Sequence, residues 1–201
     1  MNMGPVSRQL YDGTVDFVLK HRHPDVQRFR RAVEQGIEEL RKVKPNHLPA
    51  ADYLTLKLSS GDQDIDRLLH LYASHKGKLK WEQSYKKADG VVGEDMLSGY
   101  GFAEIIGKQG PFVSNSVRCG IGVWGPHVDY PRHTHKAEET YLVMSGAAYF
   151  KVGEAPEEFK SFGDVIFVES MAPHGFKTVD QALVVFYLWQ SGDLREKSTF
   201  V

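Results

Sequence analysis

The chain of 201 residues lacks most features of secreted, membrane or nucleic-acid-binding proteins. Its only cysteine, Cys119, excludes an intrachain disulfide and a cysteine-based zinc motif. No apolar run approaches the roughly 20 residues that span a bilayer, so we expect no membrane partner. Lysine and arginine total 25 against 26 aspartates and glutamates, a formal net charge of −1, which argues against non-specific binding to nucleic acid.

We also expect no secretory leader. Residues 1–16 show no charged start followed by an apolar block. A single thiol is compatible with a reducing compartment. We therefore expect a cytoplasmic protein with enough chain to bury a core without disulfides.

Residues 1–90 carry helical periodicity. Leu10–Leu19 mixes apolar and polar residues at helical spacing, and Ile65–Tyr72 repeats the pattern. Asp25–Val43 is the clearest case, with Pro24 able to begin a helix and Pro45 beyond its end. Its apolar positions, three and four apart, are Val26, Phe29, Val33, Ile37 and Leu40. These patterns predict a helical N-terminal extension, residues 1–90, packed on the rest of the chain.

Short β-rich runs separated by glycine and proline dominate residues 91–201. The candidate strands are Val117–Trp124, Thr140–Met144, Ala147–Val152, Asp164–Glu169 and Ala182–Trp189. Ser145-Gly146 and the acidic segment 153–156 are typical of hairpin turns. Turns at intervals of about ten residues predict a small antiparallel barrel or jelly roll. The predicted fold class is therefore α+β.

Metal-ligand chemistry is concentrated in one segment, which runs Tyr-Pro-Arg-His-Thr-His-Lys-Ala-Glu-Glu-Thr-Tyr from residue 130. On a single strand His133, His135 and Tyr141 would share one face, and Glu139 would join them if no bulge intervenes. His174 would arrive on a neighbouring strand or in the turn before it. Three neutral imidazoles and one carboxylate suit Fe(II), Mn, Co, Ni or Zn and leave coordination positions open, as in catalytic sites.

Each of these features also has a structural interpretation. The histidines could lie on a polar barrel face, but the spacing His-x-His-x3-Glu followed by a downstream Pro-His favours a metal site. Trp189 ends an apolar run and could only fill core. Tyr141 could be a core tyrosine with a satisfied hydroxyl, and Tyr130 could anchor a loop.

The region resembles the cupin superfamily, whose first motif reads Gly, His-x-His, x3 to x4, Glu, x6, Gly. Those places are filled by Gly125, His133, His135, Glu139 and Gly146, with an extended spacing after the first glycine. The second motif is looser: Gly163 and His174 fit, whereas Thr178 stands near an expected asparagine. The resemblance implies a double-stranded β-helix, or jelly-roll barrel, within residues 91–201. It also implies a homodimer as a common assembly.

A narrower resemblance is to the bacterial cupin-type dimethylsulfoniopropionate (DMSP) lyases of the DddL and DddQ group. It rests on Gly-Tyr-Gly-Phe-Ala-Glu-Ile-Ile-Gly at 99–107, Gly-Val-Trp-Gly at 122–125 and Tyr-Pro-x-His-x-His-x-Ala-Glu-Glu-x-Tyr at 130–141. The resemblance implies cleavage of DMSP to acrylate and dimethyl sulfide, with one Zn, Fe(II) or Mn ion per chain. The implied metal ligands are His133, His135, Glu139 and His174, although family members differ at His133.

The same resemblance makes Tyr141 the general base and places Tyr130 and Trp189 in the substrate pocket, where Tyr130 is a second catalytic candidate. A nearby dication lowers the pKa of a tyrosine from about 10, which would allow removal of the α-proton of DMSP. The metal would stabilise the resulting enolate-like charge. Aromatic rings attract a sulfonium by about 0.5–2 kcal/mol each, and Trp124 is a third candidate for that contact.

Two other classes of protein stay open at this point. Another cupin enzyme, such as an Fe(II) dioxygenase or an isomerase, would use the same ligands, because function resides in the pocket rather than the barrel. Oxygen consumption would identify the former. A non-catalytic small-molecule-binding cupin commonly carries a DNA-binding domain or a degraded ligand set. Here the ligand set is intact and the basic cluster at residues 28–31 is balanced by nearby glutamates.

Overall fold

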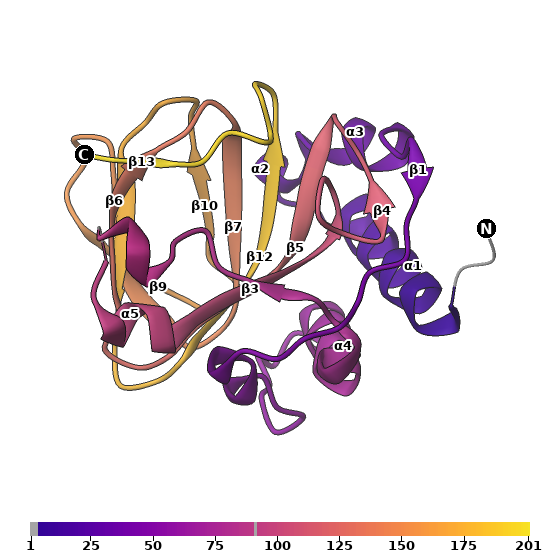
Figure 1. Ribbon diagram of the computed structural model, residues 1–201, viewed down its shortest axis with the longest axis horizontal. Coiled ribbons are helices and arrows are strands. Elements are labelled where there is room, and N and C mark those ends of the chain that lie inside the picture. The colour runs from indigo at the N-terminus through magenta and orange to yellow at the C-terminus, as the bar shows by residue number, and fades with distance from the viewer. Residues whose placement is uncertain (1–3, 91) are drawn as a thin grey trace.

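Residues 4–90 and 92–201 are described by a computed structural model, in which helices cover one side of a β-barrel (Figure 1). The α-helices are α1 (Pro5–Lys20), α2 (Pro24–Gln27), α3 (Arg30–Gln35), α4 (Gln63–His75) and α5 (Glu94–Gly99). Short 3-10 helices lie at Pro49–Tyr53, Lys76–Lys78 and Lys87–Asp89. Within the described residues, no helix is long and apolar enough to cross a membrane.

Two mostly antiparallel sheets form the barrel. The larger sheet has the order β1-β4-β3-β5-β12-β7-β10, with β2 paired to β3, and the smaller has the order β13-β6-β11-β8-β9. The strands of the larger sheet are β1 (Glu39–Leu40), β2 (Trp81–Glu82), β3 (Tyr100–Ile106), β4 (Phe112–Val113), β5 (Val117–Trp124), β7 (Glu138–Ser145), β10 (Val165–Val168) and β12 (Leu183–Gln190). Those of the smaller sheet are β6 (Asp129–Thr134), β8 (Ala147–Val152), β9 (Glu158–Ser161), β11 (His174–Thr178) and β13 (Thr199–Phe200).

Helices α1 and α4 pack together on the outer face of the larger sheet, and both were predicted from periodicity. Pro5 stands in the first turn of α1, where its missing N–H costs nothing. The side chain of Asp62 accepts hydrogen bonds from two backbone N–H groups of the first turn of α4. A hydrogen bond of 2.9 Å between Thr14 and Tyr72 joins the two helices. Burying their apolar faces contributes about 1.5–3 kcal/mol per large side chain.

The prediction of one helix over Asp25–Val43 is wrong. The segment forms the short helices α2 and α3, and beyond Gly36 the chain extends to pair β1 with β4. A Cβ on Gly36 would lie 2.3 Å from the carbonyl oxygen of Ala32, so the close approach of the chain at the end of α3 requires glycine. Pairing with the sheet overrides the periodicity of Ile37 and Leu40.

The five candidate strands are confirmed, within two residues at each end, as β5, β7, β8, β10 and β12. The segment 153–156 turns the chain between the paired strands β8 and β9, as expected. Ser145-Gly146 is not a hairpin turn, because β7 and β8 belong to different sheets. Gly146 has a φ of +76° and would place a Cβ 2.1 Å from the carbonyl oxygen of Ala182, so the corner requires glycine.

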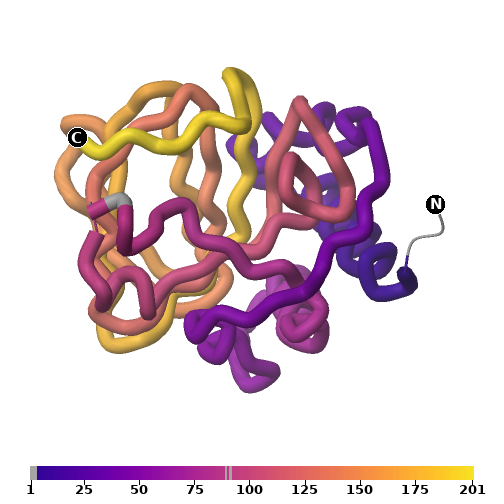
Figure 2. Tube along the Cα trace, in the orientation of Figure 1, coloured from indigo at the N-terminus to yellow at the C-terminus, as the bar shows by residue number. Residues whose placement is uncertain are grey.

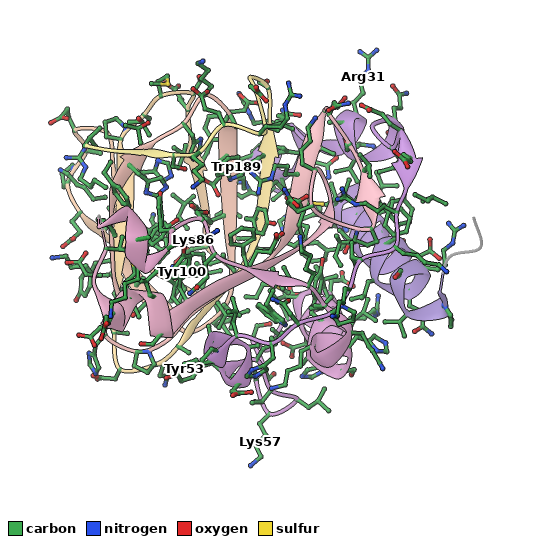
Figure 3. All side chains as sticks on the ribbon, viewed as in Figure 1. Arg31, Tyr53, Lys57, Lys86, Tyr100 and Trp189 are labelled. Atoms are coloured by element: carbon green, nitrogen blue, oxygen red, sulfur yellow. The ribbon has the colours of Figure 1, made fainter. Side chains whose placement is uncertain are left out.

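Strands β5, β7 and β12 are buried on both faces, because the helices cover one face and the barrel interior lies on the other. In β12, Phe186 and Leu188 face the helices, whereas Tyr187 and Trp189 face the interior. Figure 3 shows Trp189 and Tyr100 among the barrel strands, while Arg31 and Lys57 project from the surface. The same strands therefore supply both the helix-covered core and the wall of the barrel interior.

Candidate active site

Three imidazoles meet inside the barrel. His133 on β6 is the register partner of His174 on β11, and His135 directly follows β6. One nitrogen of each ring lies within 4.8 Å of the others, and all three side chains are buried. Across the described ranges 4–90 and 92–201, no other group of three or more histidine, cysteine or acidic residues is close enough to hold a metal ion.

The hydrogen bond at Nδ1 of each ring determines which ring nitrogen carries the proton. Each Nδ1 lies 2.9 Å from a backbone carbonyl oxygen, in the pairs His133–Pro131, His135–Ala137 and His174–Ala172. Because a carbonyl oxygen only accepts, each Nδ1 carries the hydrogen and each Nε2 of a neutral ring presents a lone pair. Metal-binding histidines in proteins are oriented in this way.

Glu139 on β7 completes the set. Its Oε2 lies 2.9 Å from Nε2 of His135 and 3.4 Å from Nε2 of His174, which has no hydrogen-bond partner among the described residues. With the ring protons already on Nδ1, neutral imidazoles face this carboxylate lone pair to lone pair. Only a positive charge, either a proton or a metal ion, stabilises that arrangement. The donor set therefore fits one divalent ion.

Burial and neighbouring side chains keep the imidazole of His133 neutral and the carboxylate of Glu139 ionised. Burial, followed by the nearby His174, lowers the pKa of His133 to about 3, so its ring is neutral at neutral pH. Burial alone raises the pKa of Glu139, but the adjacent side chains of His135 and His174 outweigh it and hold the pKa below its usual range. A neutral imidazole and an ionised carboxylate are the forms that bind metal.

The prediction that one strand carries the whole motif is wrong. His133 lies on β6 of the smaller sheet, whereas Glu139 and Tyr141 lie on β7 of the larger one. Residues 135–137 form the corner, where the backbone N–H of Met171 donates to the carbonyl oxygen of His135 at 2.9 Å. Side-chain parity cannot reveal a change of sheet. The corner brings the ligands together from two directions.

A cavity of about 260 Å³ adjoins these ligands. Six residues singled out from the sequence line it: Trp124, Tyr130, His133, Glu139, Tyr141 and Trp189. Sequence reasoning missed other lining residues, namely Glu82, Phe102, Arg118, Tyr187 and the segment 194–198. Tyr187 faces the interior as the register partner of Tyr141, a position that its apolar run did not distinguish from core.

The two predicted catalytic phenols are buried beside the ligands. Burial raises the pKa of Tyr141 well above its usual value, and the charge of Glu139 adds to the shift. Burial, followed by the neighbouring Tyr85 and Tyr100, does the same for Tyr130. Both phenols are therefore protonated unless a positive charge comes close.

The C-terminal segment crosses one end of the barrel, where Figure 2 shows it running from β12 back to β6. The chain turns at Ser191 and Gly192, which have φ values of +66° and +64°. It ends in β13, where Phe200 pairs with His133. The polar sequence of residues 191–198 gave no signal of this placement. The segment forms one wall of the cavity.

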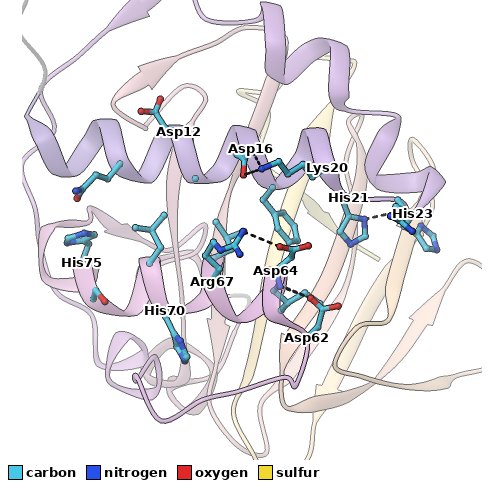
Figure 4. Close-up of a pocket in the computed structure, with 18 residues that line it drawn as sticks. Asp12, Asp16, Lys20, His21, His23, Asp62, Asp64, Arg67, His70 and His75 are labelled. Atoms are coloured by element: carbon cyan, nitrogen blue, oxygen red, sulfur yellow. Dashed lines mark hydrogen bonds and ion pairs between the residues drawn. The ribbon is translucent and has the colours of Figure 1, made fainter.

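A larger hollow of about 940 Å³ lies between α1 and α4 and shares no lining residue with the cavity (Figure 4). Two pairs of its charged side chains interact with each other: Lys20 lies 2.8 Å from Asp16, and Arg67 lies 3.2 Å from Asp64. Its histidines and aspartates form no metal-ligand group in the part of the chain that the structure describes. The hollow is a solvated groove between two helices.

Comparison with known proteins gives a consistent family. The family model described as dimethylsulfoniopropionate lyase matches residues 20–185. Dimethylsulfoniopropionate lyase DddQ of Ruegeria pomeroyi is 31% identical over 115 residues, which are 57% of this chain and 56% of that protein. A curated DddL relative from Cereibacter sphaeroides is 30% identical over 105 residues, 51% of this chain and 44% of that protein. The chain thus spans about half the length of the curated relatives it matches.

Solved structures extend the likeness along the whole chain. The crystal structure of DMSP lyase DddQ from Ruegeria pomeroyi gives a TM-score of 0.85 at 23% identity, covering 99% of this chain and 98% of that one. A chain from the crystal structures of the DMSP lyases RdDddP and RnDddQII gives 0.82 at 29% identity, covering 98% and 97%. These comparisons confirm the expected fold, a helical N-terminal region packed on a cupin barrel.

Proposed function

The chain belongs to the dimethylsulfoniopropionate lyase family, and from that premise we propose that it is a metal-dependent carbon–sulfur lyase, which cleaves DMSP to acrylate and dimethyl sulfide. One observation carries the proposal: three buried imidazoles and Glu139 converge beside a cavity lined by aromatic side chains. The first part provides a cation site, and the second accommodates a small zwitterion.

We assign His133, His135, Glu139 and His174 as ligands of one Zn, Fe(II) or Mn ion per chain. The proton positions on the three rings and the unpartnered Nε2 of His174 support the assignment. A bound divalent ion supplies positive charge, which favours a tyrosine phenolate and the negative charge that develops on the substrate.

Tyr141 is the general base in this proposal. It lies two residues after Glu139 on the same face of β7, and it lines the cavity. Its phenolate takes the α-proton of DMSP, and the electron pair of that C–H bond becomes the carbon–carbon double bond of acrylate. The bond from the β-carbon to sulfur breaks, and sulfur leaves with its electrons as neutral dimethyl sulfide. The leaving group therefore needs no acid.

The aromatic wall receives the sulfonium. The rings of Tyr130 and Trp124 meet edge to face, with centroids 5.4 Å apart, and both side chains line the cavity. Trp189 stacks on His135 at 4.0 Å, and Arg118 lies 4.9 Å from its ring centroid. A sulfonium would be repelled beside that guanidinium. We therefore assign the sulfonium to Tyr130 and Trp124, and treat Trp189 as a wall of the pocket.

The experiment for this proposal measures dimethyl sulfide in the headspace over purified, metal-loaded protein supplied with DMSP. We expect release that is absent from a matched His135→Ala variant, which loses a ligand. Release no greater than that of the variant, with Zn, Fe(II) and Mn each tested, would overturn the proposed function.

A homodimer and a cytoplasmic location stay predictions, as does a division of the chain near residue 90. The short strands β1 and β2 of the N-terminal part join the larger sheet, which favours one folding unit. Light scattering after gel filtration measures the number of chains in the assembly.

A further inference from the structure

We propose that Arg118 is a positioning residue of the metal centre, which holds the indole of Trp189 against the ligand His135. The metal-binding part of this proposal stands on the geometry of the ligands. Only its kinetic readout rests on the proposed function. Neither Arg118 nor its partner Glu104 was singled out from the sequence.

A buried ion pair with Glu104 fixes the guanidinium of Arg118. Its Nε lies 2.6 Å from Oε2 of Glu104, and the two side chains are 15% and 1% exposed. The other oxygen of Glu104 accepts hydrogen bonds from the backbone N–H groups of Gln109 and Gly110. A carboxylate held by two backbone donors is itself immobile, so it sets where the guanidinium lies.

A hydrogen bond to the C-terminal segment also fixes the guanidinium. Nη1 of Arg118 donates to the carbonyl oxygen of Leu194 at 3.2 Å. Leu194 is buried and belongs to the C-terminal segment that walls the cavity. Arg118 therefore links β5 of the larger sheet to the C-terminal segment, and it also lines the cavity.

The fixed guanidinium faces the ring of Trp189. Arg118 and Trp189 are register partners between β5 and β12, and the Cζ of Arg118 lies 4.9 Å from the ring centroid. On its other side, Trp189 is the register partner of Glu139 on β7. The imidazole of His135 stacks on the indole with centroids 4.0 Å apart and planes 28° apart. The indole thus lies between a fixed cation and a ligand ring.

This stack restricts the ring of His135. The hydrogen bond from Nδ1 to the carbonyl oxygen of Ala137 still allows the imidazole to rock about the hydrogen bond. Such rocking would move Nε2 away from the position in which it binds a metal ion. Contact with the indole face opposes the rocking. A planar guanidinium can pair with a carboxylate and stack on a ring at once, which a lysine ammonium cannot do. Loss of such supporting contacts typically weakens metal binding 10–100-fold.

The opposing interpretation is that Arg118 binds the substrate carboxylate directly, since it also lines the cavity. The two roles differ in what they change. A positioning residue changes metal affinity without any substrate present, whereas a substrate contact changes KM and leaves metal affinity alone.

The experiment titrates metal-free protein with Zn²⁺ against a chromophoric chelator. We expect Arg118→Met to bind Zn²⁺ about 10–100-fold more weakly than the wild type. Because that variant leaves the charge of Glu104 buried without a counter-ion, the double variant Glu104→Gln with Arg118→Met removes both charges and is expected to fold. Arg118→Lys should recover only part of the affinity, since it restores the charge but not the planar guanidinium beside the indole.

Arg67→Met on α4 is the matched control, because Arg67 is 68% exposed, pairs with Asp64 and does not line the cavity; it should bind Zn²⁺ like the wild type. Zn²⁺ affinity within twofold of the wild type in the folded double variant would overturn the proposal. A raised KM for DMSP with unchanged Zn²⁺ affinity would also overturn it and assign Arg118 to the substrate. If the wild type releases no dimethyl sulfide, the proposed function fails, and the Zn²⁺ titration still decides the role of Arg118.

Discussion

The helix-covered core and the barrel interior are equally buried but differ in how their polar groups are satisfied. Between α1 and α4 the hydroxyls of Thr14 and Tyr72 bond to each other at 2.9 Å. Among the described residues, buried side-chain atoms without a partner occur at Glu82, Tyr85, Trp124, Arg132, His174 and Tyr187. None of these lies on a helix, and Glu82, Trp124 and Tyr187 line the cavity.

This difference separates stability from binding. Because an unsatisfied buried polar group costs about 1–3 kcal/mol, these atoms are the ones from which a bound ion or substrate would gain most by supplying a partner. Among the described residues, the helix-covered core has no such atom, and it supplies apolar burial on the other face of the same strands. Substitutions should therefore act on stability on one face of the larger sheet and on function on the other.

The largest expected effect is on turnover in Tyr141→Phe. Loss of the general base should lower kcat by about 10²–10⁴-fold, while Zn²⁺ binding and the free energy of unfolding stay near the wild-type values. Initial rates of dimethyl sulfide release and chelator competition measure the two quantities. Full activity in this variant would remove Tyr141 as the base.

A matched pair of tyrosines tests the comparison on stability. Tyr72→Phe should lower the free energy of unfolding by about 1–3 kcal/mol, because it leaves the buried hydroxyl of Thr14 without a partner. Tyr187→Phe removes a hydroxyl that has no hydrogen-bond partner among the described residues, so stability should be unchanged or higher. Urea unfolding of both variants measures these changes. Equal destabilisation by the two would contradict the comparison.

The smallest expected effect is on the free energy of unfolding at acidic pH. The pKa of His133 is about 3 in the folded protein, below the roughly 6.5 of an unfolded histidine, so the unfolded chain takes up the proton first as the pH falls. Its contribution is present above pH 6.5 and is lost towards pH 3, by up to about 1.4 kcal/mol per pH unit. Unfolding of metal-free protein at pH 7, 6 and 5 measures the slope. His133→Asn should flatten it, and an equal slope in that variant would exclude this histidine as the cause.

Much of the barrel could be predicted from the sequence, because local signals determine it. The predicted strand Ala182–Trp189 is a continuous apolar run, and the structure forms β12 over Leu183–Gln190. The helix expected over Asp25–Val43 failed because pairing of Leu40 with Phe112 is a long-range contact that periodicity does not report.

The clustering of the three histidines with Glu139 could be predicted, because three histidines and one glutamate at cupin spacing are rare by chance. Their convergence from two sheets could not be predicted, because the alternation of side chains does not show that the chain changes sheet after Thr134. Arg118 and Glu104 were invisible for a different reason. Charged residues in strands usually face solvent, and only the sheet order reveals that this pair is buried behind Trp189.

The central claim is that one metal ion, held by three imidazoles and a carboxylate, supports cleavage of DMSP in the barrel. Its most direct test titrates metal-free protein with Zn²⁺, Fe²⁺ or Mn²⁺ while dimethyl sulfide and acrylate are measured in the same samples. We predict equal amounts of the two products, at a rate that rises linearly and stops rising at one equivalent of metal per chain. Protein that binds one equivalent of each metal and forms neither product would contradict it.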